Sequence, residues 1–361
     1  MVIYRLLLTA FCLVSLSVKA EFILQTQPNI EGDIQVNSAD LCAVAKNTKN
    51  YIDAFPDDEF AVHPGNLIKK ISLERVKNTL DFLCQLPAEK ELTQEYLIQH
   101  FDFYQWLPDK KTANKLAENS TNAVKKRLLR NIPEQQIFIT KYYTKLLQAS
   151  ERATDKFNQA LYAIPFDEKT LSLAEAEKNK SKLTRYQYTR QQVIDGVLQD
   201  KHLAKPLIWI TEEALHDVLL QGTGVVDVNG KRRYFNVHRN NGIAYDYTLG
   251  KRQQARYWYF AEVPSILGYG KTLADKISIK PDVTFAGNVK QLGLGKLFLI
   301  NYQTNGKVIN NLGVLADQGG AFDDNLFQLD FLKGSFYGWK DYYQANKHLP
   351  DYASAWLMLV K

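Results

Sequence analysis

Residues Val314–Leu332 read VLADQGGAFDDNLFQLDFL and contain four aspartates, Asp317, Asp323, Asp324 and Asp330. Apolar residues surround them, and two adjacent glycines divide the segment, which is typical of short strands joined by a turn. Clustered carboxylates can bind a metal ion, carry out acid–base chemistry or cap turns. Apolar neighbours raise the pKa of a carboxyl group, so Asp330 could act as a general acid. On the residue pattern alone, capping or pairing within a strand is the favoured interpretation.

Other chemistries have less support from the sequence. The six histidines are scattered, no HExxH or CxxC is present, and the aspartates do not have the spacing of a calcium-binding loop. There is no GxSxG element for a serine hydrolase. The glycines of Gly222-Thr223-Gly224 are more typical of a tight turn than of a phosphate-binding loop. We therefore expect neither a metal site nor a cofactor.

The N-terminus has the features of an export signal. Residues 1–20, MVIYRLLLTAFCLVSLSVKA, place Arg5 before an apolar run and end in a small-x-small cleavage site. Cleavage is expected after Ala20, with the protein in the periplasm and possible association with the outer membrane. Cys12 follows a phenylalanine, whereas a lipoprotein site needs a small residue there, so a lipid anchor is not expected.

Length, charge and cysteines restrict the class of protein further. A chain of 361 residues, 45% of them hydrophobic, is expected to form two domains. Its net charge of +6 is too small and too dispersed to indicate nucleic-acid binding. In an oxidising compartment Cys42 and Cys84 are predicted to form one disulfide that clamps the helical N-terminal region, with free thiols as the alternative.

The pattern of the chain changes near Gln136. Residues 38–130 have helical periodicity, as in Ser72–Cys84 and near Thr93–Trp106. Beyond Gln136, short β-branched and aromatic runs alternate with turn signals, among them the hairpin signal Asn229-Gly230. The expected fold is mainly β with an N-terminal α segment.

Several motifs, in order, resemble the membrane-bound lytic transglycosylase A (MltA) family of peptidoglycan-cleaving enzymes. The resemblance covers residues 137–361. It rests on Ile137–Lys145 (family F-T-G-Y-Y-T-P), Ala160–Pro165 (Y-P-I-Y-x-x-P), Thr189–Gly196 (S-R-x-E-I-x-x-G), Val218–Val226 (Q-G-S-G), Asn241–Tyr245 with Leu249–Lys251 (N-G-x-x-Y-x-x-I-G-K), Lys280–Gly287 (D-x-S-x-I-P-x-G), and Ala316–Phe322 (D-x-G-G-A-I) followed by Leu329-Asp330.

The chain departs from the family pattern in three places. Lys141 and Lys145 stand where the family has Gly and Pro. Lys280 stands where the first of three aspartates would be, with Asp282 displaced by two positions. Gln328 replaces a His or Arg, and about two extra residues separate Asp317 from Asp330, so Asp323 and Asp324 are interpreted as loop residues.

The resemblance implies a fold and a division of the chain. The fold would be a double-psi β-barrel plus a second, inserted β-barrel domain, with a substrate groove between them. Residues 21–145 would form the helical segment and the first part of the barrel. Residues 146–275 would form the insert, and residues 276–361 the three-aspartate (3D) barrel domain.

The resemblance also implies an activity. The protein would be a lytic transglycosylase that cleaves the β-1,4 bond between N-acetylmuramic acid and N-acetylglucosamine in peptidoglycan, giving 1,6-anhydromuramic acid products. Asp330 would be the single acid and base, with Asp317 as its polar partner. The residues expected to bind the glycan are Tyr142, Tyr143, Thr144, Gln221, Gly222, Thr223, Gly242, Tyr245, Gln318, Gly319 and Gly320.

Two alternatives stay open. One is a catalytically impaired pseudoenzyme that still binds cell-wall glycan, which the Lys141 and Lys280 departures motivate. The other is a hydrolytic glycosidase with a second carboxylate. The expected partners are peptidoglycan glycan strands, with cell-wall enzyme complexes as a further option and no nucleic acid, and the expected state is a monomer.

Overall fold

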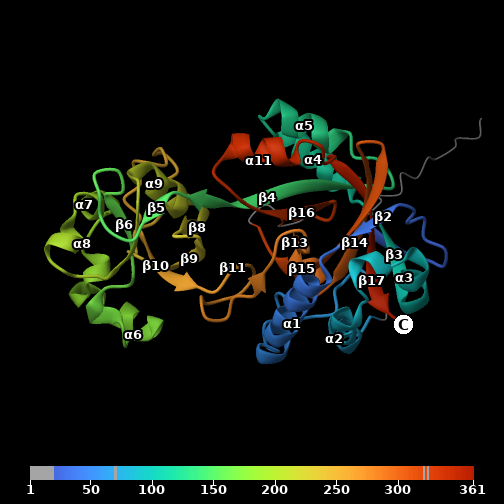
Figure 1. Cartoon of the computed structure of the whole chain (residues 1–361), viewed down its shortest axis with the longest axis horizontal. Helices are drawn as coiled ribbons and strands as arrows, with labels where there is room; N and C mark the ends of the chain where they lie inside the picture. The colour runs from blue at the N-terminus through green and yellow to red at the C-terminus, as the bar shows by residue number, and fades with distance from the viewer. Residues whose placement is uncertain (1–19, 69–70, 320–321, 323–324) are drawn as a thin grey trace, which may run out of the picture.

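The structure, a computed structural model, describes residues 20–361 except 69–70, 320–321 and 323–324. The expected signal peptide lies outside the described residues apart from Ala20, and so do Gly320, Asp323 and Asp324. None of the helices in the described part of the chain is both long and apolar enough to cross a membrane. Two bodies are visible, a barrel with its N-terminal helices and an inserted domain (Figure 1).

Six strands form the barrel. Their order is β17-β14-β15-β13-β16-β4, and pairing of Ala353 in β17 with Ile137 in β4 closes the ring. Phe285, Phe298 and Phe331 are among the aromatic residues of its core. The strands are β4 (Ile137–Leu147), β13 (Thr284–Ala286), β14 (Leu297–Thr304), β15 (Lys307–Asp317), β16 (Gln328–Phe336) and β17 (Tyr352–Val360).

The N-terminal segment packs helices on the barrel and adds strands to it. β3 pairs with β17 and β1 pairs with β3, while β2 pairs with β15. The elements are β1 (Glu21–Gln25), β2 (Asp33–Gln35), α1 (Ser38–Ala54), α2 (Leu73–Phe82), η1 (Leu83–Gln85), η2 (Glu89–Glu91), α3 (Gln94–His100), β3 (Phe101–Leu107), α4 (Lys110–Asn119) and α5 (Ala123–Arg130). Later in the barrel come β12 (Ser278–Ile279), α10 (Val289–Leu292) and α11 (Trp339–Asn346).

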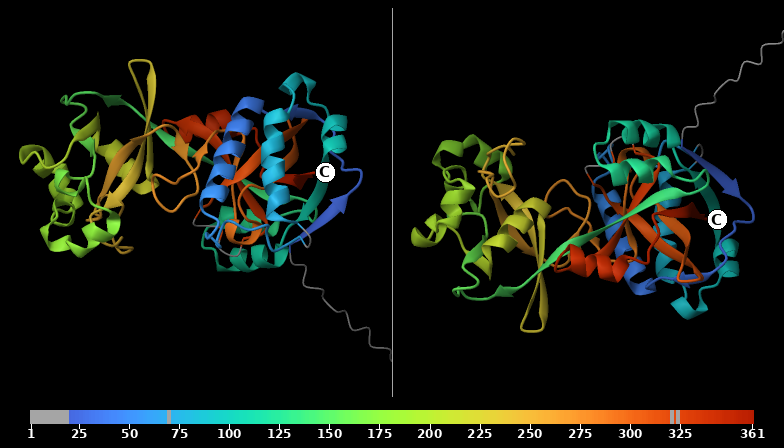
Figure 2. Two further views of the ribbon diagram at one scale, coloured as in Figure 1. Left: turned by 90° about the horizontal axis from the view of Figure 1, so that it is seen from below. Right: turned by 90° about the horizontal axis from the view of Figure 1, so that it is seen from above.

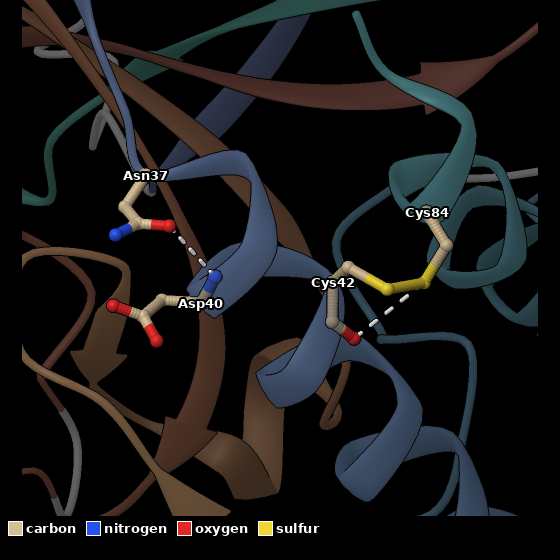
Figure 3. The surroundings of a disulfide bond; sticks show 4 residues. All are labelled: Asn37, Asp40, Cys42 and Cys84. Atoms are coloured by element: carbon tan, nitrogen blue, oxygen red, sulfur yellow. Dashed lines mark hydrogen bonds between the residues drawn. A yellow bond between two sulfur atoms is a disulfide. The ribbon is translucent and has the colours of Figure 1, made fainter. Parts of the chain in front are cut away.

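The disulfide lies in this helical segment. The sulfurs of Cys42 in α1 and Cys84 in η1 are 2.07 Å apart, so the bond links two helices that are distant in sequence (Figure 3). The Asn37 side chain caps α1 by accepting a hydrogen bond from the Asp40 amide at 3.0 Å. The predicted helix near Thr93–Trp106 is half correct. Helix α3 ends at His100, and the alternating aromatic residues that follow form strand β3 between β1 and β17.

The inserted domain grows out of the barrel along β4. This strand continues past the barrel and pairs in parallel with β8, as at Lys145 and Gly224 (Figure 2). The predicted turn at Asn229-Gly230 joins β8 to β9, and both residues have positive φ angles. The barrel sheet thus continues into the insert as β8 (Thr223–Val228), β9 (Lys231–Asn240) and β10 (Trp258–Val263); a separate sheet is formed by β5 (Ala149–Ser150), β7 (Pro206–Ile210) and β6 (Gln159–Tyr162).

Both sheets of the insert share one hydrophobic core, which includes Trp209, Phe235 and Phe260. The helices of this domain are η3 (Phe166–Glu168), α6 (Leu173–Lys178), η4 (Lys180–Lys182), η5 (Thr184–Tyr186), α7 (Arg190–Ile194), α8 (Val197–Asp200) and α9 (Glu212–Gln221). Strand β11 (Ile266–Leu267) pairs with β12 where the chain returns to the barrel. The observed architecture is mainly β, with the expected N-terminal helices and a closed barrel.

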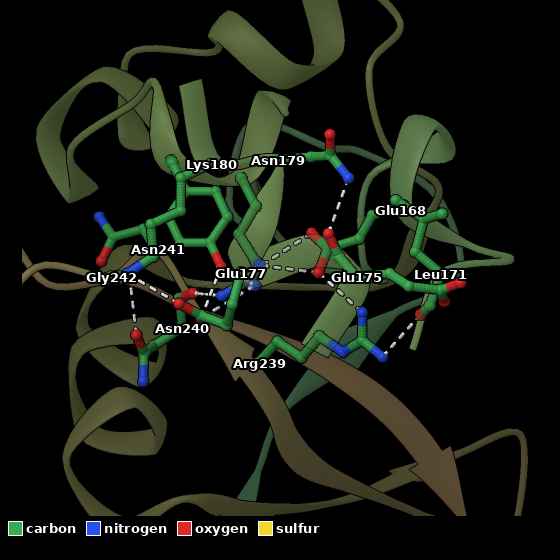
Figure 4. A network of polar contacts seen from close by, with 12 residues as sticks. Glu168, Leu171, Glu175, Glu177, Asn179, Lys180, Arg239, Asn240, Asn241 and Gly242 are labelled. Atoms are coloured by element: carbon green, nitrogen blue, oxygen red, sulfur yellow. Dashed lines mark hydrogen bonds and ion pairs between the residues drawn. The ribbon is translucent and has the colours of Figure 1, made fainter. Parts of the chain in front are cut away.

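A buried ion-pair network holds the end of β9. Glu168 is fully buried and accepts hydrogen bonds from Arg185 and Arg239, each at 2.7 Å. Arg239 also donates to the Leu171 carbonyl at 3.0 Å (Figure 4). A buried carboxylate needs such partners because it has lost its hydration. The network therefore fixes β9, which contributes to the wall of the candidate site.

Candidate active site

A cavity of about 400 Å³ lies between the barrel and the inserted domain, and we refer to it as the interdomain cavity. It contains most of the site residues predicted from the sequence. Its lining comprises Tyr142, Tyr143, Thr144, Ala286, Asp317, Gln318, Gly319 and Asp330 from the barrel side, Gln221, Gly222, Thr223, Asn236 and Val237 from the insert, and Ile266, Leu267, Gly268 and Lys276 from the returning chain.

Strand pairing brings the two aspartates into one wall of the cavity. Ala286 on β13 pairs with Asp317 on β15 and, on its other side, with Asp330 on β16. Directly paired residues on neighbouring strands point to the same face of a sheet. The β13–β15 register shifts by one residue just before Ala286, and both Asp317 and Asp330 line the interdomain cavity.

Asp330 is poorly hydrated. Its Oδ1 atom is inaccessible to solvent and has no hydrogen-bond partner. Burial raises the pKa of Asp330 to about 7; the Thr140 hydroxyl opposes this shift, the charge of Asp317 adds to it, and Lys141 opposes it. A carboxyl group with this pKa is largely protonated at slightly acidic pH and can give up its proton near neutrality.

Asp317 is held in a defined position by two hydrogen bonds. The Tyr142 hydroxyl donates to Oδ2 at 2.8 Å, and the Gln318 amide donates to Oδ1 at 2.8 Å. Burial raises the pKa of Asp317 to about 6, although both of these donors and the charge of Lys276 act to lower it. The two carboxyl groups thus differ in their surroundings, since Asp317 has fixed donors and Asp330 retains an unpartnered oxygen.

The opposite wall of the cavity is built by the turn after α9. Gly222 ends this helix with a φ of +83°, a conformation that favours glycine. A Cβ atom on Gly224 would lie 3.1 Å from Val218 and 3.3 Å from Leu147, so this glycine permits close packing of α9 on β4. The turn interpretation of the Gly-Thr-Gly sequence is therefore correct, and the turn places Thr223 in the cavity wall.

Three predicted residues lie elsewhere or outside the described part. Gly242 does not line the cavity and faces Tyr186, whose ring a Cβ atom would approach to 2.8 Å. Tyr245 also lies away from it and packs edge-on against Tyr247 at 5.2 Å between ring centroids. Gly320 is not among the described residues. Tyr143 does line the cavity, and its ring stacks on Tyr342 at 4.6 Å.

The lysines that depart from the family pattern make specific contacts. Lys141 points to the main chain of the loop before β17, where it donates to the carbonyls of Leu349 and Pro350. Lys145 pairs with Asp217 of α9 at 3.0 Å and so links β4 to the insert. Lys280 does not line the cavity. Gln328 donates to the Thr140 hydroxyl at 2.6 Å, beside Asp330.

Seven residues of the cavity wall were not predicted as site residues from the sequence: Ala286, Asn236, Val237, Ile266, Leu267, Gly268 and Lys276. Gly268 is required by a tertiary contact, because a Cβ atom there would lie 2.5 Å from the Ala316 carbonyl oxygen, and no local pattern indicates this contact. The others are ordinary strand or loop residues whose role depends on long-range pairing. No group of three or more His, Cys, Asp or Glu side chains in the described ranges is arranged to bind a metal ion.

Comparisons with known proteins bear on the family resemblance and on the fold. Residues 138–253 match the family model of the MltA-specific insert domain. A search of curated protein sequences found no match. The resemblance to the MltA family is confirmed by this domain together with the fold, which is shared with solved MltA structures along most of the chain.

Three solved structures illustrate the shared fold. Escherichia coli MltA with bound chitohexaose is 15% identical, with 94% of each chain covered and a TM-score of 0.54. MltA from Neisseria gonorrhoeae is 14% identical, with 94% of this chain and 92% of that chain covered and a TM-score of 0.55. A membrane-bound lytic murein transglycosylase from Agrobacterium tumefaciens is 13% identical, with 89% and 92% covered and a TM-score of 0.52.

Proposed function

We propose that this protein, whose MltA insert domain is set into an MltA fold, is a lytic transglycosylase of peptidoglycan. It would cleave the β-1,4 bond between N-acetylmuramic acid and N-acetylglucosamine and leave a 1,6-anhydro ring on the muramic acid. The observation that carries the proposal is Asp330, a carboxyl group with a pKa of about 7 in the wall of the interdomain cavity.

The reaction needs one carboxyl group in two protonation states. Protonated Asp330 donates its proton to the glycosidic oxygen as the bond from that oxygen to the anomeric carbon breaks. The 6-hydroxyl oxygen of the muramic acid forms a new bond to the anomeric carbon, and its proton passes to the Asp330 carboxylate. The reaction consumes no water, and Asp330 is protonated again at its end. A pKa near the working pH is the best compromise for a group that must both give and take a proton.

Asp317 is assigned a supporting role. Its carboxylate holds the Tyr142 hydroxyl at 2.8 Å, so the ring of this tyrosine is fixed in the cavity wall. Its charge raises the pKa of Asp330 and would also stabilise positive charge that develops on the sugar ring. Asp317 therefore tunes and orients the site, whereas Asp330 transfers the proton.

The remaining cavity wall is suited to a sugar chain. Gln221, Gly222 and Thr223 supply hydrogen-bonding groups on the insert side, while Tyr142 and Tyr143 supply aromatic surface on the barrel side. Binding of chitohexaose, a chain of N-acetylglucosamine, to E. coli MltA supports a glycan as ligand here. Periplasmic location, a monomeric state and contacts with other cell-wall enzymes remain predictions from the sequence.

Digestion of purified peptidoglycan sacculi tests the proposal. We expect the wild-type protein to release 1,6-anhydro-muropeptides, identified by mass spectrometry, and Asp330→Asn to release none above background. Asp155→Asn, a change at an exposed aspartate outside the cavity, should keep wild-type activity. Absence of wild-type products with retained binding to sacculi would favour the pseudoenzyme. Products with reducing-end muramic acid would favour a hydrolase.

A further inference from the structure

Two unpartnered oxygen atoms belong to opposite walls of the interdomain cavity. Among the described residues, six buried side-chain nitrogen or oxygen atoms lack a hydrogen-bond partner. Asp330 Oδ1 and Asn236 Oδ1 are the two whose residues line the cavity. A buried acceptor without a partner destabilises a protein, so its retention calls for an explanation. The proposed reaction accounts for Asp330 and leaves Asn236 unexplained.

Asn236 lies in the middle of a sheet and has little freedom to move its backbone. On β9 it pairs with Thr223 of β8 on one side and with Ala261 of β10 on the other. The ion-pair network around Glu168 and Arg239 anchors the end of the same strand (Figure 4). Only 4% of Asn236 is exposed, and the pairing places its side chain on the same face as that of Thr223, which also lines the cavity.

The two side chains together leave one acceptor and one donor unused. Asn236 Nδ2 donates to the Thr223 hydroxyl oxygen at 2.8 Å, so the hydroxyl proton remains available as a donor. Asn236 Oδ1 remains available as an acceptor. If the Asn236 amide turns over, the two roles exchange between the residues, and the pair again presents one donor and one acceptor. The terminal torsion of asparagine is soft, so a small rotation can bring the free atom to a ligand.

A secondary amide has the complementary pair of groups, one N–H donor and one C=O acceptor. We propose that Asn236, together with Thr223, binds the N-acetyl group of a sugar residue and thereby selects N-acetylated over de-N-acetylated glycan. A free glucosamine ammonium offers donors alone and leaves the Thr223 proton without an acceptor. This inference rests on the proposed function, because it assigns a specificity determinant to the same glycan cavity.

Binding of two sugar hexamers to an inactive protein measures this preference. In an Asp330→Asn background, which prevents cleavage, calorimetry gives Kd for chitohexaose and for the glucosamine hexamer. We expect chitohexaose to bind more tightly. Asn236→Leu should weaken chitohexaose binding about fivefold to tenfold, as expected for loss of one or two hydrogen bonds, and should weaken binding of the glucosamine hexamer by a smaller factor.

Two further variants distinguish loss of the preference for N-acetylated glycan from a loss of affinity that is common to both hexamers. Thr223→Val should reduce the preference in the same way, and the double variant should lose little more than either single variant, because both residues act on one group. Val237→Ala, which trims an apolar residue of the same wall, should change Kd for both hexamers by a similar factor. Asn236→Leu removes the unpartnered Oδ1 acceptor together with the Nδ2 hydrogen bond to Thr223, so the two effects oppose each other and Tm should change little.

The outcomes distinguish the inference from the proposed function. Unchanged chitohexaose affinity in both Asn236→Leu and Thr223→Val, or an equal loss for both hexamers, overturns the role of the Asn236–Thr223 pair while the glycan site stands. Binding of neither hexamer by the parent protein overturns the glycan site itself, and the inference with it. A preference that disappears in both variants supports the inference.

Discussion

Asp317 and Asp330 pair with the same residue, Ala286, one from each side, and both line the interdomain cavity. The charge of Asp317 raises the pKa of Asp330 to a degree that depends on this placement. Because the two groups influence each other, the pH dependence of the proposed reaction is a property of the pair. The strand order of the barrel thus enters directly into the chemistry of the site.

Removal of the Asp317 charge should move the alkaline limb of the activity profile. Activity requires protonated Asp330, so kcat/KM is expected to fall as pH rises through about 7. In Asp317→Asn the pKa of Asp330 loses a contribution that raises it, so the alkaline limb should shift to lower pH by about one unit or less. A profile of sacculus digestion against pH measures the shift. A limb that stays in place would show that the two carboxyl groups do not interact.

Removal of the charge of Lys141 should move the alkaline limb of the activity profile in the opposite direction. The charge of Lys141 lowers the pKa of Asp330, and burial of Lys141 lowers the pKa of the lysine itself. Lys141→Met removes the cation at similar volume, so the alkaline limb should shift to higher pH by about one unit or less. Lys111→Met, at an exposed position of α4, serves as the matched control. A shift to lower pH in Lys141→Met would contradict the assigned electrostatics.

Asp330 is expected to lower the stability of the protein at neutral pH. Its pKa is raised from about 4 in the unfolded chain to about 7, so the folded state binds more protons and stability falls as pH rises through this window. Asp330→Asn should therefore raise the free energy of unfolding by on the order of 2–4 kcal/mol at pH 7 and by almost nothing at pH 3.

Thermal unfolding at the two pH values measures this difference, with Asp155→Asn as a surface control. A variant that loses activity while it gains Tm at pH 7 would show that the carboxyl group is kept at a cost in stability. Equal Tm values for wild type and Asp330→Asn at pH 7 would contradict the poorly hydrated environment of Asp330.

Lys296 is expected to make the stability of the protein rise with pH, whereas Asp330 makes it fall. This residue is 1% exposed and its Nζ lies 3.4 Å from the carbonyl oxygens of His63 and Leu294. Burial lowers its pKa to about 7, so the unfolded state binds more protons and stability rises as pH increases from 7 toward 10. Lys296→Met should stabilise the protein at pH 7 by on the order of 2–4 kcal/mol, and the gain should shrink as the solution becomes alkaline. Denaturant titrations at pH 7 and pH 9.5 measure it; a gain that does not depend on pH would argue against a buried amine.

The strand runs could be predicted from local pattern, whereas the assignment of Asp317 and Asp330 to one site depended on the resemblance to the MltA family. Asp317 and Asp330 each end or interrupt an apolar strand run, and both occur in the cavity wall. Thr223 follows a helix that stops at a glycine, which is again a local signal. The turn itself needs no knowledge of the rest of the chain, but the placement of these residues in one site rested on the ordered motifs of the family resemblance.

The parts that could not be predicted depend on pairing between distant segments. Asn236 enters the cavity wall because β9 pairs with Thr223 across a hairpin, and its own neighbours give no hint of this. The local pattern near Thr93–Trp106 predicts a helix throughout, because the pairing of its second half with β1 and β17 is not encoded locally. Gly242 lies away from the cavity because buried Asn241 folds its loop back, donating to the Tyr188 and Ala255 carbonyls at 3.0 Å.

In the proposed reaction Asp330 is the acid and base, and the 6-hydroxyl of the muramic acid, not water, attacks the anomeric carbon. Digestion of sacculi in water enriched in heavy oxygen tests this mechanism most directly. Attack by the 6-hydroxyl gives anhydro-muropeptides that contain no solvent oxygen, whereas hydrolysis places one heavy oxygen at each new reducing end. We predict unlabelled 1,6-anhydro products from the wild-type protein and none from Asp330→Asn. Labelled reducing ends from the wild type, or full activity in Asp330→Asn, would contradict the account.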